Sequence, residues 1–279
     1  MLQKPFFALA LVFLVSPFVL ASQLNVLSPV EQTIVASDEV LDLGVIGPGQ
    51  TVELITSRAS GELAKNVETP GEALWDQLLV VRESLPAGWS ADDSKLFEKP
   101  FHAFVTASPT ASDGEYSFQL KTTDQYEGAE EKVFNAKVRI SKDLLEQEVS
   151  PSMETVGVGL PAVFLVRLRN RSSASDVFEL SASGVPGGWK ETRKVFVKFN
   201  DSVSVPYEIL PGEQGKFGIS LLSTSLSSSL INDKDDVTLV SVSSLEQDFK
   251  ALKNGLLLFP TVDQVVYSAL AVISHLLYR

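Results

Sequence analysis

Strict alternation of apolar and polar residues marks the clearest strands in the middle of the chain. Tyr116, Phe118 and Leu120 alternate with polar residues, and residues 134–140 repeat the pattern. Such alternation predicts strands with one face in a core and the other in water. Similar patterns predict further strands at 39–45, 51–57, 77–83, 101–106, 163–169, 176–182, 194–199, 203–209, 216–222 and 237–243.

Clusters of Gly, Pro, Asp and Ser separate these strand patterns, as in GPGQ (47–50) and LPGEQG (210–215). No long amphipathic helical pattern interrupts them, although short helical turns are expected at 71–76 and 142–147. A high density of short strands is typical of antiparallel sandwiches. The sequence therefore predicts an all-β fold.

The strand patterns occur in two series that match each other in order. The matched pairs are 47–58 with 159–170, 77–89 with 178–189, 113–123 with 211–224, and 131–141 with 235–244. Four matches in register predict a tandem repeat of sandwich-sized units. We expect the units at 23–145 and 146–248, with residues 142–151 as the linker.

Each unit contains a Pro–x–Gly–Trp turn, LPAGW at 85–89 and VPGGW at 185–189. We expect each turn, made by Pro86, Gly88 and Trp89 or by Pro186, Gly188 and Trp189, to place its Trp as a cap on the sandwich core. The alternative is that the two tryptophans form an aromatic ligand platform.

With their later turns, Asp113-Gly114-Glu115-Tyr116 and Pro211-Gly212-Glu213, these motifs resemble NEW3-like, immunoglobulin-like modules of archaeal and bacterial cell-surface proteins. The resemblance implies two tandem immunoglobulin-like antiparallel β-sandwiches and a cell-surface accessory role, and it brings no catalytic residues. The first unit departs from the pattern through a long insert at 59–76.

Both ends of the chain are hydrophobic. Residues 1–22 combine Lys4, an apolar run and a small residue at Ala21, which predicts a secretory signal peptide cleaved after Ala21. The alternative is an uncleaved N-terminal membrane anchor. Either reading predicts an exported protein with its domains outside the cytoplasm.

Residues 249–279 predict a C-terminal hydrophobic helix, and we expect no signalling domain after it. On a helix, Thr261, Gln264, Ser268 and His275 would form one polar seam on an apolar surface. This pattern favours a membrane helix against a partner helix, or an interfacial helix. The alternative is packing on the sandwiches.

Composition excludes several classes of protein and site. A formal net charge of -12 argues against nucleic-acid binding, which needs clustered Lys and Arg. The absence of cysteine excludes disulfides, zinc-thiolate sites and a cysteine nucleophile. The two histidines, His102 and His275, lack metal-ligand spacing, and we expect His102 to face solvent from a strand.

No nucleophile–base–acid grouping or Gly–x–Ser–x–Gly motif stands out, so we expect no enzymatic activity, no cofactor and no metal. Acidic residues cluster at Asp92-Asp93 and at Asp233, Asp235 and Asp236, and the second cluster lacks the Gly and the terminal Glu of a calcium loop. We expect them to be solvated loops, with weak cation binding as the alternative.

Trp75, in the insert, is the best candidate for an exposed ligand contact. The sequons at Asn170 and Asn200 predict N-glycosylation of an exported chain. Together these patterns predict an exported, membrane-tethered surface protein with protein partners, acting as a structural or interaction module, for example as a subunit of a membrane or envelope complex. The alternative is a carbohydrate-binding or enzyme-accessory module that presents Trp75 or loop aromatics to glycans.

Overall fold

Residues 22–35, 39–65 and 71–243 are described by a computed structural model, and their regular structure is almost entirely β-strand. The only helical elements in these ranges are two 3-10 turns, η1 (Arg82–Ser84) and η2 (Gly187–Trp189). The predicted all-β fold is therefore confirmed. No helix among the described residues is long and apolar enough to cross a membrane. The predicted signal segment (1–22) and C-terminal helix (249–279) lie outside these ranges, except for Ser22.

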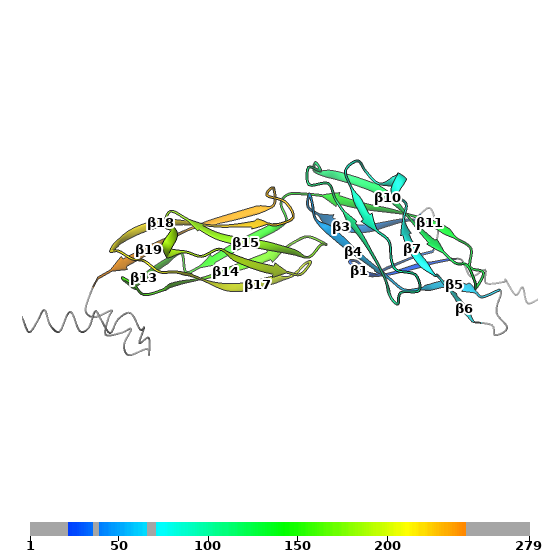
Figure 1. Cartoon of the computed structure of the whole chain (residues 1–279), viewed down its shortest axis with the longest axis horizontal. Coiled ribbons are helices and arrows are strands. Elements are labelled where there is room, and N and C mark those ends of the chain that lie inside the picture. Colours follow the sequence, from blue (N-terminus) through cyan, green and yellow to red (C-terminus); the bar gives the residue numbers. More distant parts are fainter. Residues whose placement is uncertain (1–21, 36–38, 66–70, 244–279) are drawn as a thin grey trace, which may run out of the picture.

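The first half of the chain forms two facing sheets around one core (Figure 1). One sheet has the order β2 (Gln32–Ile34), β1 (Leu24–Ser28), β4 (Thr51–Thr56), β9 (Phe101–Thr106) and β8 (Ser90–Asp92). The other has the order β3 (Val40–Ile46), β11 (Lys132–Ile140), β10 (Gly114–Thr123) and β7 (Gln77–Val80). A separate hairpin joins β5 (Ala59–Leu63) and β6 (Glu72–Leu74). We call this part the first sandwich.

The second half of the described chain forms the second sandwich around its own core. Its smaller sheet has the order β12 (Leu145–Ser150), β14 (Ala162–Asn170) and β17 (Ser202–Ile209). The larger sheet has the order β13 (Met153–Gly157), β19 (Asn232–Val242), β18 (Gly215–Ser225), β15 (Asp176–Ser183) and β16 (Arg193–Val197).

The two sandwiches share one strand topology. In each, the first strand pairs antiparallel with a later strand of its own sheet, as β1 does with β4 and β12 with β14. A strand between these two lies in the other sheet and runs parallel to the last strand of the sandwich, as β3 does with β11 and β13 with β19. Seven shared strands are divided between the two sheets in the manner of an immunoglobulin-like sandwich. The four pairs of matching sequence segments lie on equivalent strands, namely β4 and β14, β7 and β15, β10 and β18, and β11 and β19.

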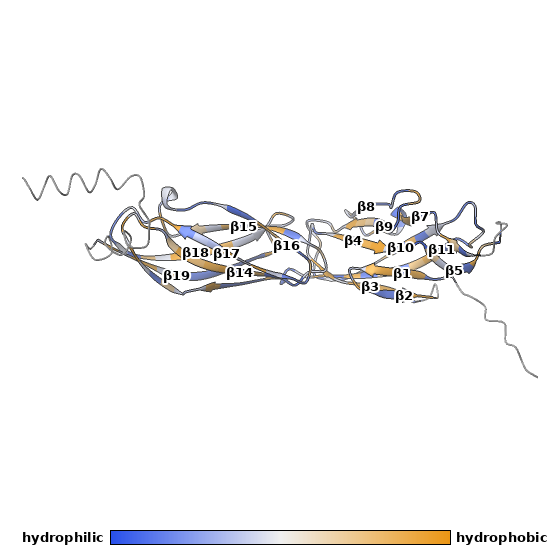
Figure 2. Ribbon diagram, turned by 90° about the horizontal axis from the view of Figure 1, so that it is seen from below, coloured by the Kyte–Doolittle hydropathy of each residue, from blue (hydrophilic) through white to orange (hydrophobic). Residues whose placement is uncertain are grey.

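Side-chain alternation explains why these strands form. In β14, Ala162, Phe164, Val166 and Leu168 are buried, while the residues between them face solvent. Burial of one large apolar side chain contributes about 1.5–3 kcal/mol, so a strand with several such residues is fixed in its register. The strands of both cores accordingly carry the most hydrophobic residues, as Figure 2 shows.

Three local predictions are wrong. Residues 142–147 are not a helical turn, and 142–151 is not a free linker, because β12 pairs with β14 at six positions. The outward Glu146 and Glu148 obscure the strand pattern in the sequence, yet they form ion pairs with Arg169 and Arg167 across the strand pair. Residues 71–76 likewise contain β6, which pairs with β5.

Candidate binding site at the free end of the first sandwich

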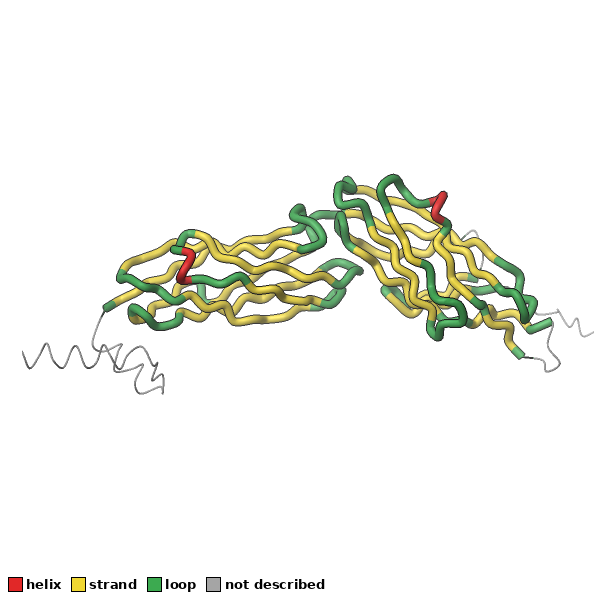
Figure 3. The backbone as a smooth tube through the Cα atoms, viewed as in Figure 1, coloured by secondary structure: helices red, strands yellow, loops and turns green. Residues whose placement is uncertain are grey.

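Three loops of the first sandwich lie together at the end that points away from the second sandwich (Figures 1 and 3). They follow β4 (57–65 and 71–76), β8 (93–100) and β10 (124–131). We call these described residues the tip. The corresponding loops of the second sandwich, after β14 and β18, contact the first sandwich, so the two equivalent ends have different surroundings.

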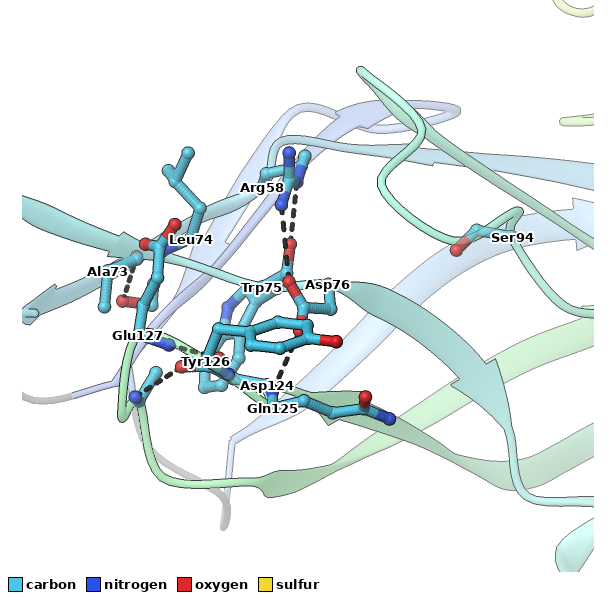
Figure 4. A network of polar contacts seen from close by, with 12 residues as sticks. Arg58, Ala73, Leu74, Trp75, Asp76, Ser94, Asp124, Gln125, Tyr126 and Glu127 are labelled. Carbon is cyan, nitrogen blue, oxygen red and sulfur yellow. Dashed lines mark hydrogen bonds and ion pairs between the residues drawn. The ribbon is translucent and has the colours of Figure 1, made fainter. Parts of the chain in front are cut away.

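A buried ion pair fixes the centre of the tip. The guanidinium of Arg58 donates from Nε to the carbonyl oxygen of Trp75 at 2.7 Å and lies 3.5 Å from Asp76 Oδ1. Asp76 Oδ2 accepts the backbone N–H of Gln125 at 2.8 Å, and the Asp76 carbonyl accepts that of Phe97. Asp76 therefore connects all three loops, and Figure 4 shows its contacts with Arg58 and Gln125.

Two further carboxylates hold the loop after β10. Asp124 accepts backbone N–H bonds from Tyr126 at 2.8 Å and Glu127 at 2.9 Å, and also one from Ala129. Glu127 Oε2 accepts the N–H of Leu74 at 2.6 Å. The carboxylates beneath the tip surface thus accept hydrogen bonds from backbone N–H groups. These bonds make the loops rigid, and the carboxylates already have partners within the protein.

The loops after β8 and β10 expose three large apolar side chains above this polar network. Phe97 is 45% exposed and Tyr126 is 64% exposed, their ring centroids lie 6.3 Å apart, and Leu96 is exposed beside Phe97. The Arg58 guanidinium lies 5.5 Å from the Phe97 ring centroid, within cation–π range. The tip therefore presents a small aromatic surface on a rigid base.

Phe97 has a strained backbone, with φ at +59°. Left-handed conformations of bulky residues are rare and cost roughly 1–3 kcal/mol, and they concentrate at functional sites. The N–H of Phe97 donates to the Asp76 carbonyl at 2.8 Å, so the fold holds this conformation. An exposed ring held in a strained conformation is a feature of a recognition site.

Sequence reasoning missed Leu96, Phe97 and Tyr126. The signal was present as a pair of apolar residues within DDSKLFEKP and a lone Tyr in the polar turn DQYEGAEE. Apolar residues that interrupt polar loops have no strand pattern to bury them. Only the fold shows that these two loops meet.

The expectation of an exposed Trp75 is wrong. Its side chain is 0% exposed, and its indole N–H donates to the carbonyl oxygen of Gln23 at 3.2 Å. The insert folds back on β1 and carries the ring into the core. Trp75 cannot offer its face to a ligand while the first sandwich is folded.

Trp89 and Trp189 occupy corresponding places in the two sandwiches. Each backbone N–H donates at 3.1 Å to the Pro carbonyl three residues earlier, Pro86 or Pro186. Trp89 packs on Tyr116 with ring centroids 5.3 Å apart, and Trp189 packs edge-on against Phe217 at 4.9 Å. Trp89 is buried and Trp189 is half-buried, and both contact their own core.

The two sequons lie in different environments. Asn170 is 0% exposed, its Nδ2 donates to the carbonyl of Ala174 at 2.8 Å, and its Oδ1 accepts the N–H of Ser172 at 3.0 Å. The atom that a glycan would modify is thus bonded inside the fold, and the predicted glycosylation of Asn170 is wrong for the folded chain. Asn200 is exposed, and its glycosylation stays a prediction.

The remaining candidates have structural contacts. His102 is half-buried on β9, with Nδ1 2.7 Å from Glu53 Oε1. Asp93 accepts the N–H of Val80 at 2.7 Å and pairs with Arg82 at 3.0 Å, so it provides a hydrogen-bond partner for a backbone N–H of the edge strand β7. Asp233 accepts the N–H of Gln147 at 2.8 Å.

Asp235 lies beside Asp233 on β19, and one of its carboxylate oxygens is buried without a hydrogen-bond partner. Burial raises the pKa of the Asp235 carboxyl, and the neighbouring carboxylates of Asp233 and Asp236 raise it further. Across the described residues, no three His, Asp or Glu side chains are grouped to hold a metal ion. The seam residues Thr261, Gln264, Ser268 and His275 lie outside these residues.

No protein-family model matches the chain, and no curated protein matches it significantly. Among solved structures, a chimeric titin Z1Z2 functionalised with an exogenous KLER peptide from decorin is 13% identical over 80% of this chain and 99% of that chain, with a TM-score of 0.35. PapD-like domain 7 of human CEP192 is 12% identical over 37% of this chain and 88% of its own, with a TM-score of 0.25.

A β-glucosidase from Listeria innocua, in complex with glucose, is 14% identical over 44% of this chain, with a TM-score of 0.27. The matched region is 20% of the enzyme's length. TM-scores this low support no argument about fold or function. The immunoglobulin-like β-sandwich assignment rests on the strand order of the chain itself.

Proposed function

We propose that this chain is an exported, membrane-tethered surface protein whose tip binds a partner protein. The observation that carries the proposal is the exposed group of Leu96, Phe97 and Tyr126 on a rigid polar base. Rigid aromatic anchors provide contact area at low entropic cost and dominate protein interfaces.

A protein partner suits this surface better than a glycan. Sugar hydroxyls need free polar groups beside the aromatic rings, yet Asp76, Asp124 and Glu127 already accept hydrogen bonds from the tip's own backbone. Trp75, the residue chosen for glycan contact, is buried. The proposed role is binding, with no catalytic step.

The proposed arrangement is two tandem immunoglobulin-like domains, of the kind that the NEW3-like resemblance implies. The described chain starts at Ser22 near the tip and ends at Ser243 at the opposite end (Figure 1). A tether within 249–279 would therefore hold the tip away from the membrane, where a partner can reach it.

Site-specific photocrosslinking in intact cells tests the proposal. A photoreactive amino acid in place of Tyr126 should give one defined protein adduct, and the adduct should be lost when Leu96→Ser is added. The matched control is Phe196, an aromatic residue of the second sandwich that is 63% exposed. The proposal fails if position 196 gives the same adduct, or if position 126 gives none.

A further inference from the structure

The second sandwich contacts one end of the first through two of its loops. Residues 44–50, at the end of β3 and in the turn to β4, meet residues 172–176 and 225–231, at the loops after β14 and β18. We call these three segments the joint.

Backbone hydrogen bonds cross the joint at Val45. The N–H of Ser173 donates to the Val45 carbonyl at 2.7 Å, and the N–H of Val45 donates to Ser173 Oγ at 3.2 Å. The hydroxyl of Ser172 also donates to the Val45 carbonyl, at 3.3 Å. Bonds that involve the backbone of both partners fix their relative position more tightly than contacts between long surface side chains.

Gln50 lies at the centre of the joint and is fully buried. Its Nε2 donates to Asp176 Oδ2 at 2.6 Å, and its Oε1 accepts the hydroxyl of Ser172 at 2.6 Å. Asp176 also accepts from Ser225 Oγ at 2.6 Å and from Ser227 Oγ at 2.9 Å. Opening the joint would remove one donor from the buried Asp176 carboxylate and would leave Gln50 Nε2 without its partner, with only the N–H of Gly47 still bonded to Oε1, which is unfavourable.

Glycines allow the two backbones to approach this closely. A Cβ on Gly49, whose φ is +71°, would lie 2.3 Å from the carbonyl oxygen of Ser227. A Cβ on Gly47 would lie 2.2 Å from Cδ1 of Ile231. The apolar contacts are reciprocal, because Ala174 belongs to the core of the first sandwich and Val45 packs against that of the second.

The chain between the sandwiches offers no free hinge. The N–H of Ser141 donates to the Ile46 carbonyl at 3.0 Å, and the Leu144 carbonyl accepts the N–H of Arg171 at 2.8 Å. β12 begins directly afterwards, at Leu145. Residues 141–144 connect the two sandwiches, and this segment is thus hydrogen-bonded to the first sandwich at Ser141 and to the second at Leu144.

We propose that the joint makes the two sandwiches one rigid unit, with Gln50 as the residue that fixes their relative orientation. Neighbouring domains move relative to each other by default unless their interface is large and well packed. Here a buried polar network around Gln50 would restrict this motion. The inference is independent of what the tip binds.

Distance measurements between two spin labels test the proposal. The chain has no cysteine, so labels can be placed on introduced cysteines at two exposed strand positions, Ser117 on β10 and Glu208 on β17. The unchanged joint should give one narrow distance peak. Gln50→Ala and Gly49→Ala should each lose this single peak and give a broad distribution.

Gly159→Ala is the matched control for backbone strain. Gly159 lies in the corresponding turn of the second sandwich with φ at +77°, and a Cβ there would meet nothing within 4 Å. It should keep the narrow peak. Far-UV circular dichroism checks that all variants are folded. A broad distribution before any change to the joint, or a narrow one in both joint variants, would overturn the proposal.

Discussion

At the scale of single residues, the repeated Pro–x–Gly–Trp turns have the same contacts but different depths of burial. Trp89 is 9% exposed and packs on Tyr116, whereas Trp189 is half-buried against Phe217. Each aromatic partner stands two residues after the Gly that begins β10 or β18. The sequence predicts this equivalence, but it cannot show how much of each ring water reaches.

Trp89→Ala should lower the free energy of unfolding by about 3–5 kcal/mol, the usual cost of deleting a buried aromatic ring. Trp189→Ala should cost less, because part of its ring is already exposed in the folded state. Urea unfolding followed by far-UV circular dichroism measures both. Unchanged stability together with loss of partner binding would instead favour a ligand platform.

The glycines of the two turns differ in conformation. Gly88 has φ at +77°, and a Cβ there would lie 3.1 Å from Ser108 Oγ. Gly188 has no positive φ, and a Cβ there would meet nothing within 4 Å. The turns are thus closed by the same hydrogen bond with different backbone angles.

Gly88→Ala should therefore destabilise the protein by roughly 1–2 kcal/mol, the cost of a left-handed residue with a Cβ. Gly188→Ala should leave stability unchanged or raise it by about 0.4–1 kcal/mol, because Ala restricts the unfolded chain. Thermal unfolding of the two variants side by side provides the comparison. Equal losses would show that the two turns share one backbone conformation.

The candidate site residues were the least predictable part of the sequence. A sequon and a lone Trp in an insert are local patterns, whereas burial depends on segments far away in the chain, as with Asn170 beside Val197 and Trp75 beside Gln23. The exposed Phe97 and Tyr126 come from loops 29 residues apart that only the sandwich brings together.

At the scale of elements, alternation predicted most strands of both sandwiches, because a half-buried strand must alternate. It missed β12, where charged residues face outward and Gln147 occupies an inward position. Inside the fold, Gln147 Nε2 donates to the Leu221 carbonyl at 3.0 Å and Oε1 accepts the hydroxyl of Ser223. A buried polar residue with tertiary partners cannot be recognised from a local pattern.

The carboxyl group of Asp235, on β19 where this strand lies against β12, should make the free energy of unfolding depend on pH. The pKa of Asp235 is raised in the folded state, chiefly by burial, so the folded chain binds its proton more tightly than the unfolded chain. Its contribution to stability is fully present below the ordinary pKa and is lost as pH rises through the folded value. Removing the charge should therefore stabilise the protein at neutral pH.

Asp235→Asn should raise the unfolding temperature at pH 7 and should give no such gain at pH 3, where the carboxyl is protonated in both states. Glu208→Gln, at an exposed position of β17, is the control for removing one negative charge. Differential scanning calorimetry at the two pH values provides the measurement. A gain of equal size at both pH values would show that the ionisation of Asp235 is not its cause.

At the scale of the whole molecule, most of the net negative charge lies on the first sandwich, which carries the tip. Residues 23–141 contain 19 acidic and 9 basic side chains, whereas residues 142–243 contain 13 and 10. A field of one sign accelerates the encounter with partners of the opposite charge and weakens with salt. We therefore expect the partner of the tip to present a basic surface.

The two ends of the described chain lie at opposite ends of the molecule, so the place of the tether decides which end faces outward (Figure 1). The full chain should stay in the membrane pellet after carbonate extraction, and a chain ending at Ser243 should be released as folded protein. The truncation keeps both cores, which lie entirely within the described residues, so its release would reflect the missing segment rather than unfolding. The truncated chain could instead stay in the pellet and still carry residues 1–21. In that case the N-terminal segment is the anchor and the tip faces the membrane. If the full chain is released by carbonate, neither segment inserts and the tethered arrangement is wrong.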